Sequence, residues 1–63
     1  MELYYLLAKN YDQVAMLTNS DTARGLALDA WYKVIRLADK SVGRELIWAI
    51  EADDAVRNQS THN

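Results

Sequence analysis

Hydrophobic and polar positions alternate with helical spacing along most of this chain, most clearly over residues 26–38. At about 100° per residue, the apolar residues of this stretch cover more than half of the helix circumference. Asp29 and Lys33 lie on the remaining face, four residues apart with the acid first, an order that stabilises a helix. Such a wide apolar face predicts a central helix that has core on two sides, with Trp31 as its structural anchor.

Residues 2–18 predict a helix that precedes the central one, because the chain contains no proline that would break it. Six apolar residues share one face of this helix: Leu3, Leu6, Leu7, Tyr11, Val14 and Leu17. Tyr5 and Met16 project from its polar face and lie in one row, about three turns apart. They are either isolated exposed side chains or the edge of a binding patch, and both residue types suit protein interfaces.

Residues 18–22 are turn and capping residues and predict a short connection, which makes the first two helices antiparallel neighbours. Residues 39–41 give a weaker turn signal. The chain therefore either breaks there before a third helix at 42–57 or continues as one helix over 22–57. Heptad steps favour the continuous helix. The large apolar residues after position 45 are shifted by about 100° from the earlier stripe, more than heptad drift explains, and favour the break.

The third segment is apolar on two sides. One side carries Val42, Leu46, Ile47 and Ile50. Trp48 and Ala52 lie nearly opposite, and a helix with two apolar sides is either buried or serves two interfaces. Trp48 therefore packs within the core or anchors a contact between subunits, as tryptophan often does.

The chain has 63 residues, of which 51% are hydrophobic, and it has no cysteine. We expect one helical domain at 1–57 and a disordered polar tail at 58–63. A domain of this size buries only about 60% of its unfolded surface and has no disulfide to support it. The expected fold is therefore all-α, an antiparallel helical hairpin plus a third segment, completed by homodimerisation.

The sequence contains few residues suited to catalysis. The only histidine, His62, lies in the polar tail, and there is no glycine motif that would hold a phosphate. We expect no enzymatic activity, no cofactor and no metal. The first ten residues lack the basic region of a secretory signal, and no apolar run approaches the roughly 20 residues that cross a bilayer, so we expect a cytoplasmic protein.

The leading hypothesis is a homodimeric regulator or inhibitor that binds another protein and occludes it. The expected interface residues are Tyr5, Met16, Trp48 and Ala52. The alternative is a small DNA-binding regulator that uses a basic ridge of Lys33, Arg36, Lys40 and Arg44. Intervening acidic residues and a net charge of −2 weaken that alternative. A structural assembly subunit whose only partner is itself is the third possibility.

Overall fold

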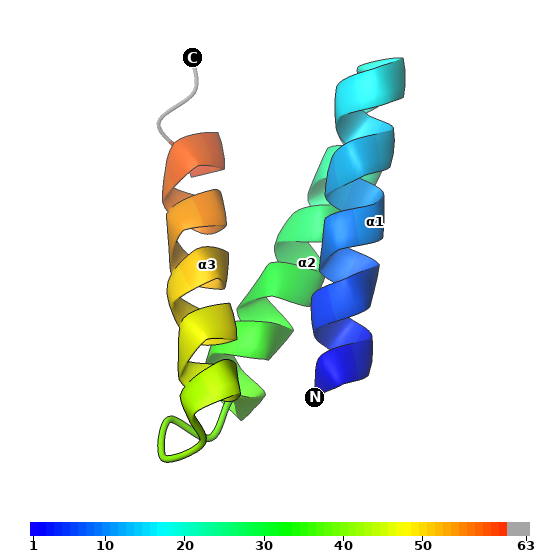
Figure 1. Ribbon diagram of the computed structural model, residues 1–63. Helices are drawn as coiled ribbons and strands as arrows, with labels where there is room; N and C mark the ends of the chain where they lie inside the picture. The colour runs from blue at the N-terminus through cyan, green and yellow to red at the C-terminus, as the bar shows by residue number, and fades with distance from the viewer. Residues whose placement is uncertain (61–63) are drawn as a thin grey trace.

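The computed structural model describes residues 1–60, and within them the chain forms three helices and no strand. Helix α1 spans Glu2–Thr18, α2 spans Asp21–Leu37 and α3 spans Gly43–Ser60 (Figure 1). The Cα radius of gyration is 11.3 Å, close to the roughly 11 Å expected of a compact domain of this length. The all-helical class predicted from the sequence is confirmed.

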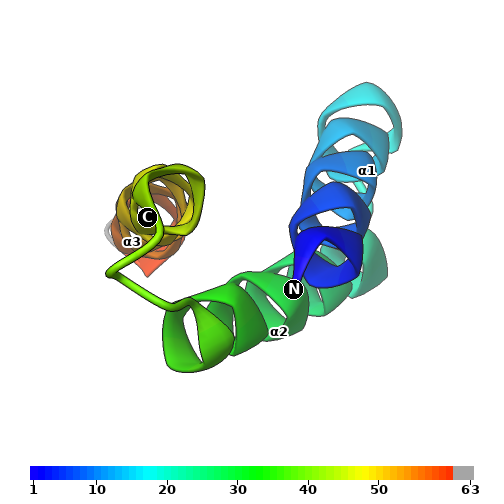
Figure 2. The same ribbon diagram turned by 60° about the horizontal axis from the view of Figure 1, so that its bottom comes forward.

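Helix α2 holds the other two helices together, because it packs against both α1 and α3. Figure 2 shows α1 and α3 standing on the same side of α2 and apart from each other. Long side chains bridge them, as described below. The central helix therefore contacts both of the other helices, as expected, but both contacts lie on one side of it.

Local hydrogen bonds fix the turn between α1 and α2. Asn19 ends α1 in the left-handed region at φ 54°, a conformation that asparagine tolerates better than most residues. The Ser20 side chain caps α2 by accepting the backbone N–H of Ala23 at 3.2 Å. Both features confirm the turn predicted for this part of the chain.

The chain breaks between α2 and α3. Ala38 adopts an extended conformation, and the Asp39 carboxylate accepts the backbone N–H of Ser41 at 2.9 Å and its hydroxyl at 2.6 Å. The Glu45 carboxylate in turn accepts the backbone N–H of Asp39 at 2.9 Å. These bonds satisfy the polar groups of a non-helical turn. The expected break is confirmed, and the alternative of one continuous helix is wrong.

Helix α3 extends further than the sequence suggests. It continues through Ser60, so residues 58–60 of the expected disordered tail are helical. The Gln59 side chain donates from Nε2 to the Asp12 Oδ1 of α1 at 3.1 Å, which holds this last turn against the rest of the chain. His62 lies outside the described residues.

The core consists mainly of small side chains. Its buried members are Ala8, Ala15, Ala23, Ala27, Ala30, Trp31, Val34, Ala49 and Ala52. Of the residues described, Trp31 and Val34 are the largest fully buried side chains, and Trp31 is 2% exposed. The helices therefore pack through alanine surfaces around one indole, and most of the larger aliphatic side chains lie outside.

Helix α1 is rotated relative to its predicted orientation. Helix α1 buries Ala8 and Ala15, neither of which is among the six residues of the predicted apolar face. The centre of that face is exposed to solvent at four positions, namely Leu3, Leu6, Val14 and Leu17. The broad leucine face was thus found from the sequence, but its direction was not.

Candidate protein interface

Three aromatic rings meet where the three helices approach one another. The ring of Tyr5 on α1 stacks on Trp48 of α3, with centroids 4.8 Å apart and planes at 17°. The same ring meets Trp31 of α2 edge-on, with centroids 5.9 Å apart and planes at 73°. Both arrangements are favourable for aromatic side chains. The cluster joins α1, α2 and α3 through one tyrosine.

A polar network closes the outer side of this cluster. The Tyr5 hydroxyl donates to Glu51 Oε1 at 2.9 Å, and Lys9 Nζ lies 3.2 Å from Glu51 Oε2. Burial, and then the hydrogen bond to Glu51, raise the pKa of the Tyr5 hydroxyl above its ordinary value. The Glu51 carboxylate also raises the pKa of Lys9, chiefly through their hydrogen bond. The network thus ties α1 to α3 by charge as well as by ring contact.

These contacts change the assignment of three expected interface residues. Tyr5 is half-buried against the core and does not form an exposed row with Met16. Trp48 is also half-buried and packs inside the domain, one of the two possibilities left open by the sequence. Ala52 is 0% exposed, so a partner cannot reach it on the folded chain. The aromatic side of α3 therefore faces the core of this domain.

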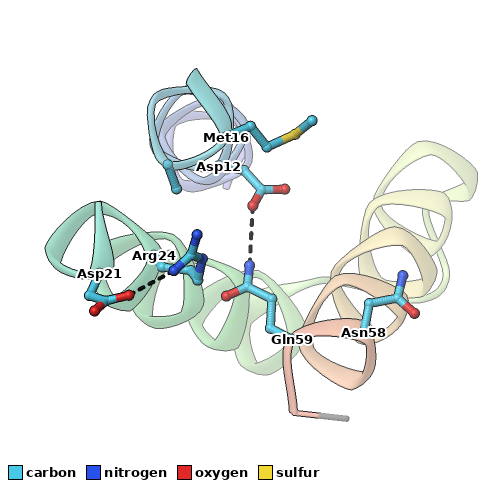
Figure 3. A pocket seen from close by; sticks show the side chains of 7 residues that line it. Asp12, Met16, Asp21, Arg24, Asn58 and Gln59 are labelled. Carbon is cyan, nitrogen blue, oxygen red and sulfur yellow. Dashed lines mark hydrogen bonds and ion pairs between the residues drawn. The ribbon is translucent and has the colours of Figure 1, made fainter. Parts of the chain in front are cut away.

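Met16 is the expected interface residue that remains open to solvent, at 82% exposure. It stands at the rim of a hollow of about 630 Å³ between the ends of the three helices (Figure 3). The hollow is lined by Asp12, Ala15, Met16, Asp21, Arg24, Asn58 and Gln59. Five of these seven residues have polar side chains, so the hollow offers hydrogen-bonding groups beside apolar surface.

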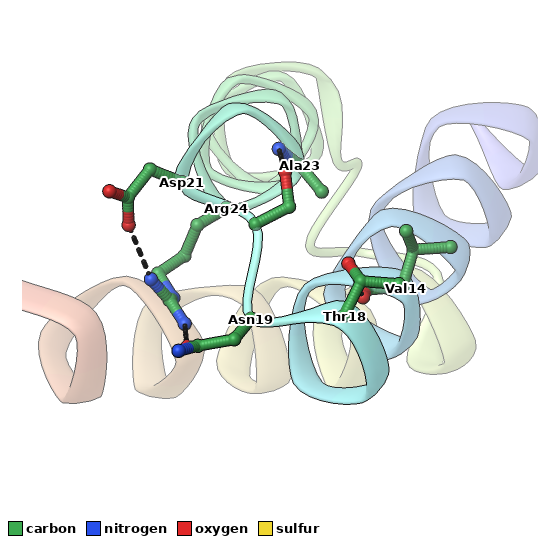
Figure 4. Close-up of polar contacts among 7 residues, drawn as sticks. Val14, Thr18, Asn19, Asp21, Ala23 and Arg24 are labelled. Atoms are coloured by element: carbon green, nitrogen blue, oxygen red, sulfur yellow. Dashed lines mark hydrogen bonds and ion pairs between the residues drawn. The ribbon is translucent and has the colours of Figure 1, made fainter.

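The cation at this rim is already bound within the chain. Arg24 donates from Nη1 to Asp21 Oδ1 at 2.7 Å and from Nη2 to Asn19 Oδ1 at 2.9 Å (Figure 4). The Arg24 guanidinium therefore links the loop between α1 and α2 to the first turn of α2. An anionic ligand at this site would have to compete with both contacts.

Two apolar surfaces that the chain leaves uncovered are the strongest candidates for contact with another molecule. The first, the α3 face, consists of Leu46, Ile47 and Ile50 of α3 and of Val42, which directly precedes the helix; all four are exposed. The second, the α1 seam, consists of Leu3, Leu6, Leu7, Asn10, Gln13, Val14 and Leu17; Leu7 is half-buried and the others are exposed. The apolar residues of both surfaces were recognisable from helical spacing, but they were not assigned to an interface.

A shallow hollow of about 300 Å³ adjoins the α3 face. Its lining is Ile35, Lys40, Leu46, Ala49, Ile50 and Asp53. Four of these six side chains are apolar, and Lys40 and Asp53 are charged. A large apolar side chain from a partner fits such a site, because interface anchors commonly enter apolar pockets with polar rims.

The break before α3 divides the four residues of the predicted basic ridge among two helices and the turn between them. All four are exposed, but Lys33 and Arg36 belong to α2, Lys40 to the turn and Arg44 to α3. The break before α3 ends the helical spacing that suggested a single line. Lys33 Nζ lies 5.2 Å from the ring centroid of Tyr4, and the Arg44 guanidinium lies 5.8 Å from that of Trp48. Both cations therefore cover aromatic rings of their own domain.

Within residues 1–60, no group of three or more histidine, cysteine, aspartate or glutamate side chains could hold a metal ion. Across the same residues, no helix is long and apolar enough to cross a membrane. Comparison with protein families, with curated proteins and with solved structures finds no match. The exposed surfaces of this chain are therefore the features that indicate its function.

Proposed function

We propose that this chain is a small protein-binding module that acts as a homodimer and regulates a partner protein by covering part of its surface. In this proposal α1 and α2 form an antiparallel hairpin, and α3 presents the surface that the partner contacts. The observation that carries the proposal is the exposure of large apolar side chains over an alanine core. Leu17 is 78% exposed and Ile47 62%, whereas seven alanines are buried.

This distribution is costly for an isolated chain. Burying a leucine or isoleucine side chain contributes about 1.5–3 kcal/mol, and the chain forgoes much of this at positions such as Leu17, Ile47 and Ile50. Single exposed apolar residues are common and need no explanation. Grouped apolar residues on one helix face are characteristic of surfaces that bind another molecule.

The α3 face is the surface we assign to the regulated partner. It combines four apolar side chains with the adjoining hollow, and its edge carries Lys40 and Asp53. An apolar centre with a charged rim is the usual arrangement of a protein interface. We expect the partner to contribute an apolar anchor, such as leucine or an aromatic residue, that enters the hollow beside Ile50.

The test compares two charged substitutions at exposed apolar positions. Proteins retained by the tagged wild-type chain are identified by mass spectrometry, and each is then purified and titrated directly. Ile47→Glu should weaken binding of the true partner at least tenfold, because it places a charge within the α3 face. Met16→Glu should leave this affinity unchanged.

The opposite result would refute the assignment. If Met16→Glu weakened binding and Ile47→Glu did not, the interface would lie at the end of the molecule around the larger hollow. Circular dichroism must show that both variants remain helical. Both positions are exposed, so neither charge should unfold the chain.

A further inference from the structure

The α1 seam follows the whole length of its helix. Seventeen residues at a rise of about 1.5 Å give a strip roughly 25 Å long. The seam contains five apolar residues and two amides, and none of its members is charged. The charged residues of α1 are Glu2, Lys9 and Asp12, and they lie outside it. A second copy could therefore approach the seam without bringing like charges into contact.

The seam is nearly symmetric about Asn10. Leu3 and Leu17 lie seven residues on either side of it and share its row along the helix. In the row on one side, Leu7 and Val14 lie at nearly equal distances before and after Asn10. In the row on the other side, Leu6 and Gln13 lie at nearly equal distances before and after Asn10. A two-fold axis beside Asn10 would thus place Leu3 against Leu17 of a second copy. It would also place Leu7 against Val14 of that copy. A contact between identical patches has this self-complementary form.

We propose that a second copy of this chain packs on the α1 seam, with the two α1 helices antiparallel about a two-fold axis beside Asn10. This inference rests on the proposed function and gives its homodimer a defined interface. The Asn10 amides of the two copies face each other, and each can both donate and accept a hydrogen bond. A paired asparagine in a largely apolar seam fixes the register at some cost in stability.

Neighbouring leucines of α2 favour the antiparallel direction. Lys33 reaches the Tyr4 ring of α1, which places the Lys33 flank of α2 beside α1. Leu26 and Leu37 follow helical spacing with Lys33, and both are exposed. The half-buried Leu7 marks the side of the seam that turns toward α2. In an antiparallel pair the two α2 helices lie on the same side of the seam, so their leucines extend one continuous contact.

This extension matters because the α1 seam alone is small. A strip about 25 Å long and one helix, about 10 Å, wide is modest beside the roughly 800 Å² that each partner of a stable complex usually buries. Adding Leu26 and Leu37 from each copy brings four more apolar side chains into the contact. A parallel pair would place the two α2 helices on opposite sides and would split this surface.

The decisive experiment introduces opposite charges at the two ends of the seam. Leu3→Glu and Leu17→Lys each suit the helix dipole at their own end, so both variants should stay folded. Sedimentation equilibrium of the wild type should give twice the chain mass of 7.2 kDa. Each variant alone should dimerise at least tenfold more weakly, because a charge then faces leucine across the contact.

Mixing the two variants distinguishes the two directions. In the antiparallel pair the new carboxylate at position 3 faces the new ammonium at position 17, while the other end keeps its two leucines. The equimolar mixture should therefore regain the dimer, and the double variant L3E/L17K should regain it on its own. In a parallel pair the double variant would bring like charges together. A mixture that stays monomeric would overturn the antiparallel arrangement.

Further outcomes separate this inference from the proposed function. Ile47→Glu, on the α3 face, should leave the dimer mass unchanged; if it abolished the dimer, the seam would not be the interface. A monomeric wild type at 100 µM or above would overturn the inference. Loss of partner binding on Ile47→Glu would then still support the α3 face as the binding surface, without a homodimer.

Discussion

At the scale of single residues, Tyr5 makes the most varied set of contacts. Its hydroxyl donates to Glu51, and this bond together with burial raises the pKa of Tyr5 above its ordinary value of 10.0. Glu51 also raises the pKa of Lys9 above 10.5. Because both pKa values are higher in the folded state, the stabilisation is complete below about pH 10. It is lost as the pH rises through the folded pKa values.

We therefore expect the melting temperature of the wild type to fall as the pH is raised above 10, and that of Tyr5→Phe to fall less. At neutral pH the same substitution should cost about 1 kcal/mol, since it removes one hydrogen bond and keeps the ring. Tyr32→Phe, at an exposed position on α2, is the matched control and should follow the wild type. Parallel curves for wild type and Tyr5→Phe would show that the hydroxyl does not contribute.

The position of Tyr5 could not have been obtained from the sequence. Helical spacing places it among Lys9 and Asp12, on the side of α1 that reads as polar. The residues that make this side an interior one, Trp48 and Glu51, lie more than forty positions away on α3. Trp31, in contrast, stands inside a broad apolar stripe of its own helix, and its burial was predicted correctly.

At the scale of the helices, Gly25 is a site where stability can be gained. It lies in the interior of α2 on the exposed side, its φ is not positive, and a Cβ there would meet nothing within 4 Å. Gly25→Ala should stabilise the chain by about 0.5–1 kcal/mol, because glycine loses more backbone entropy in a helix. Thermal melting should show a rise of about 4–8 °C per kcal/mol.

Gly43 provides the comparison, since it also has open space around it but stands at the first position of α3. Helix propensity matters less at an end than in the interior, so Gly43→Ala should change the melting temperature less than Gly25→Ala. A lower melting temperature for Gly25→Ala would mean that this face of α2 contacts another molecule in solution.

The end of α1 and the start of α2 were predictable because local residues set them. The cap at Ser20 and the left-handed Asn19 belong to a run of turn formers, and α1 ends where that run begins. The end of α3 was not predictable in this way. Residues 58–60 are polar, and the bond from Gln59 to Asp12 joins positions 47 residues apart. A signal that depends on another helix leaves no local pattern.

At the scale of the whole molecule, the sequence specified which faces are apolar but not which of them meet. Both α1 and α3 offer a face of large aliphatic residues and a face with alanine at its centre or edge. The chain buries the alanine faces around Trp31, for which Ala8 and Ala52 leave room. Leucine and isoleucine faces of the same helices then point outward. Which faces pack together depends on all three helices at once. The pattern of a single helix therefore left Trp48 with two possible roles, in the core or at an interface.

The same packing predicts unequal stability across the molecule. Helix α2 packs more extensively on α1 than on α3, and α3 meets α1 through Trp48, the Glu51 network and the Gln59 bond. Backbone amides of α3 should therefore exchange with deuterium faster than those of α1 and α2, through local detachment of α3. Trp48→Ala should cost about 2 kcal/mol, less than loss of a fully buried tryptophan, and should accelerate exchange mainly in α3.

Ile47→Ala is the matched control for this experiment, because it lies on the same helix but points outward. With the purified protein alone, Ile47→Ala should leave the deuterium exchange rates of the α3 amides unchanged. Equal acceleration in all three helices on Trp48→Ala would show that the chain opens as a single cooperative unit. Within the chain, α3 packs less extensively than α2. Slower exchange in α3 than in α2 would therefore mean that another copy or a partner protects α3.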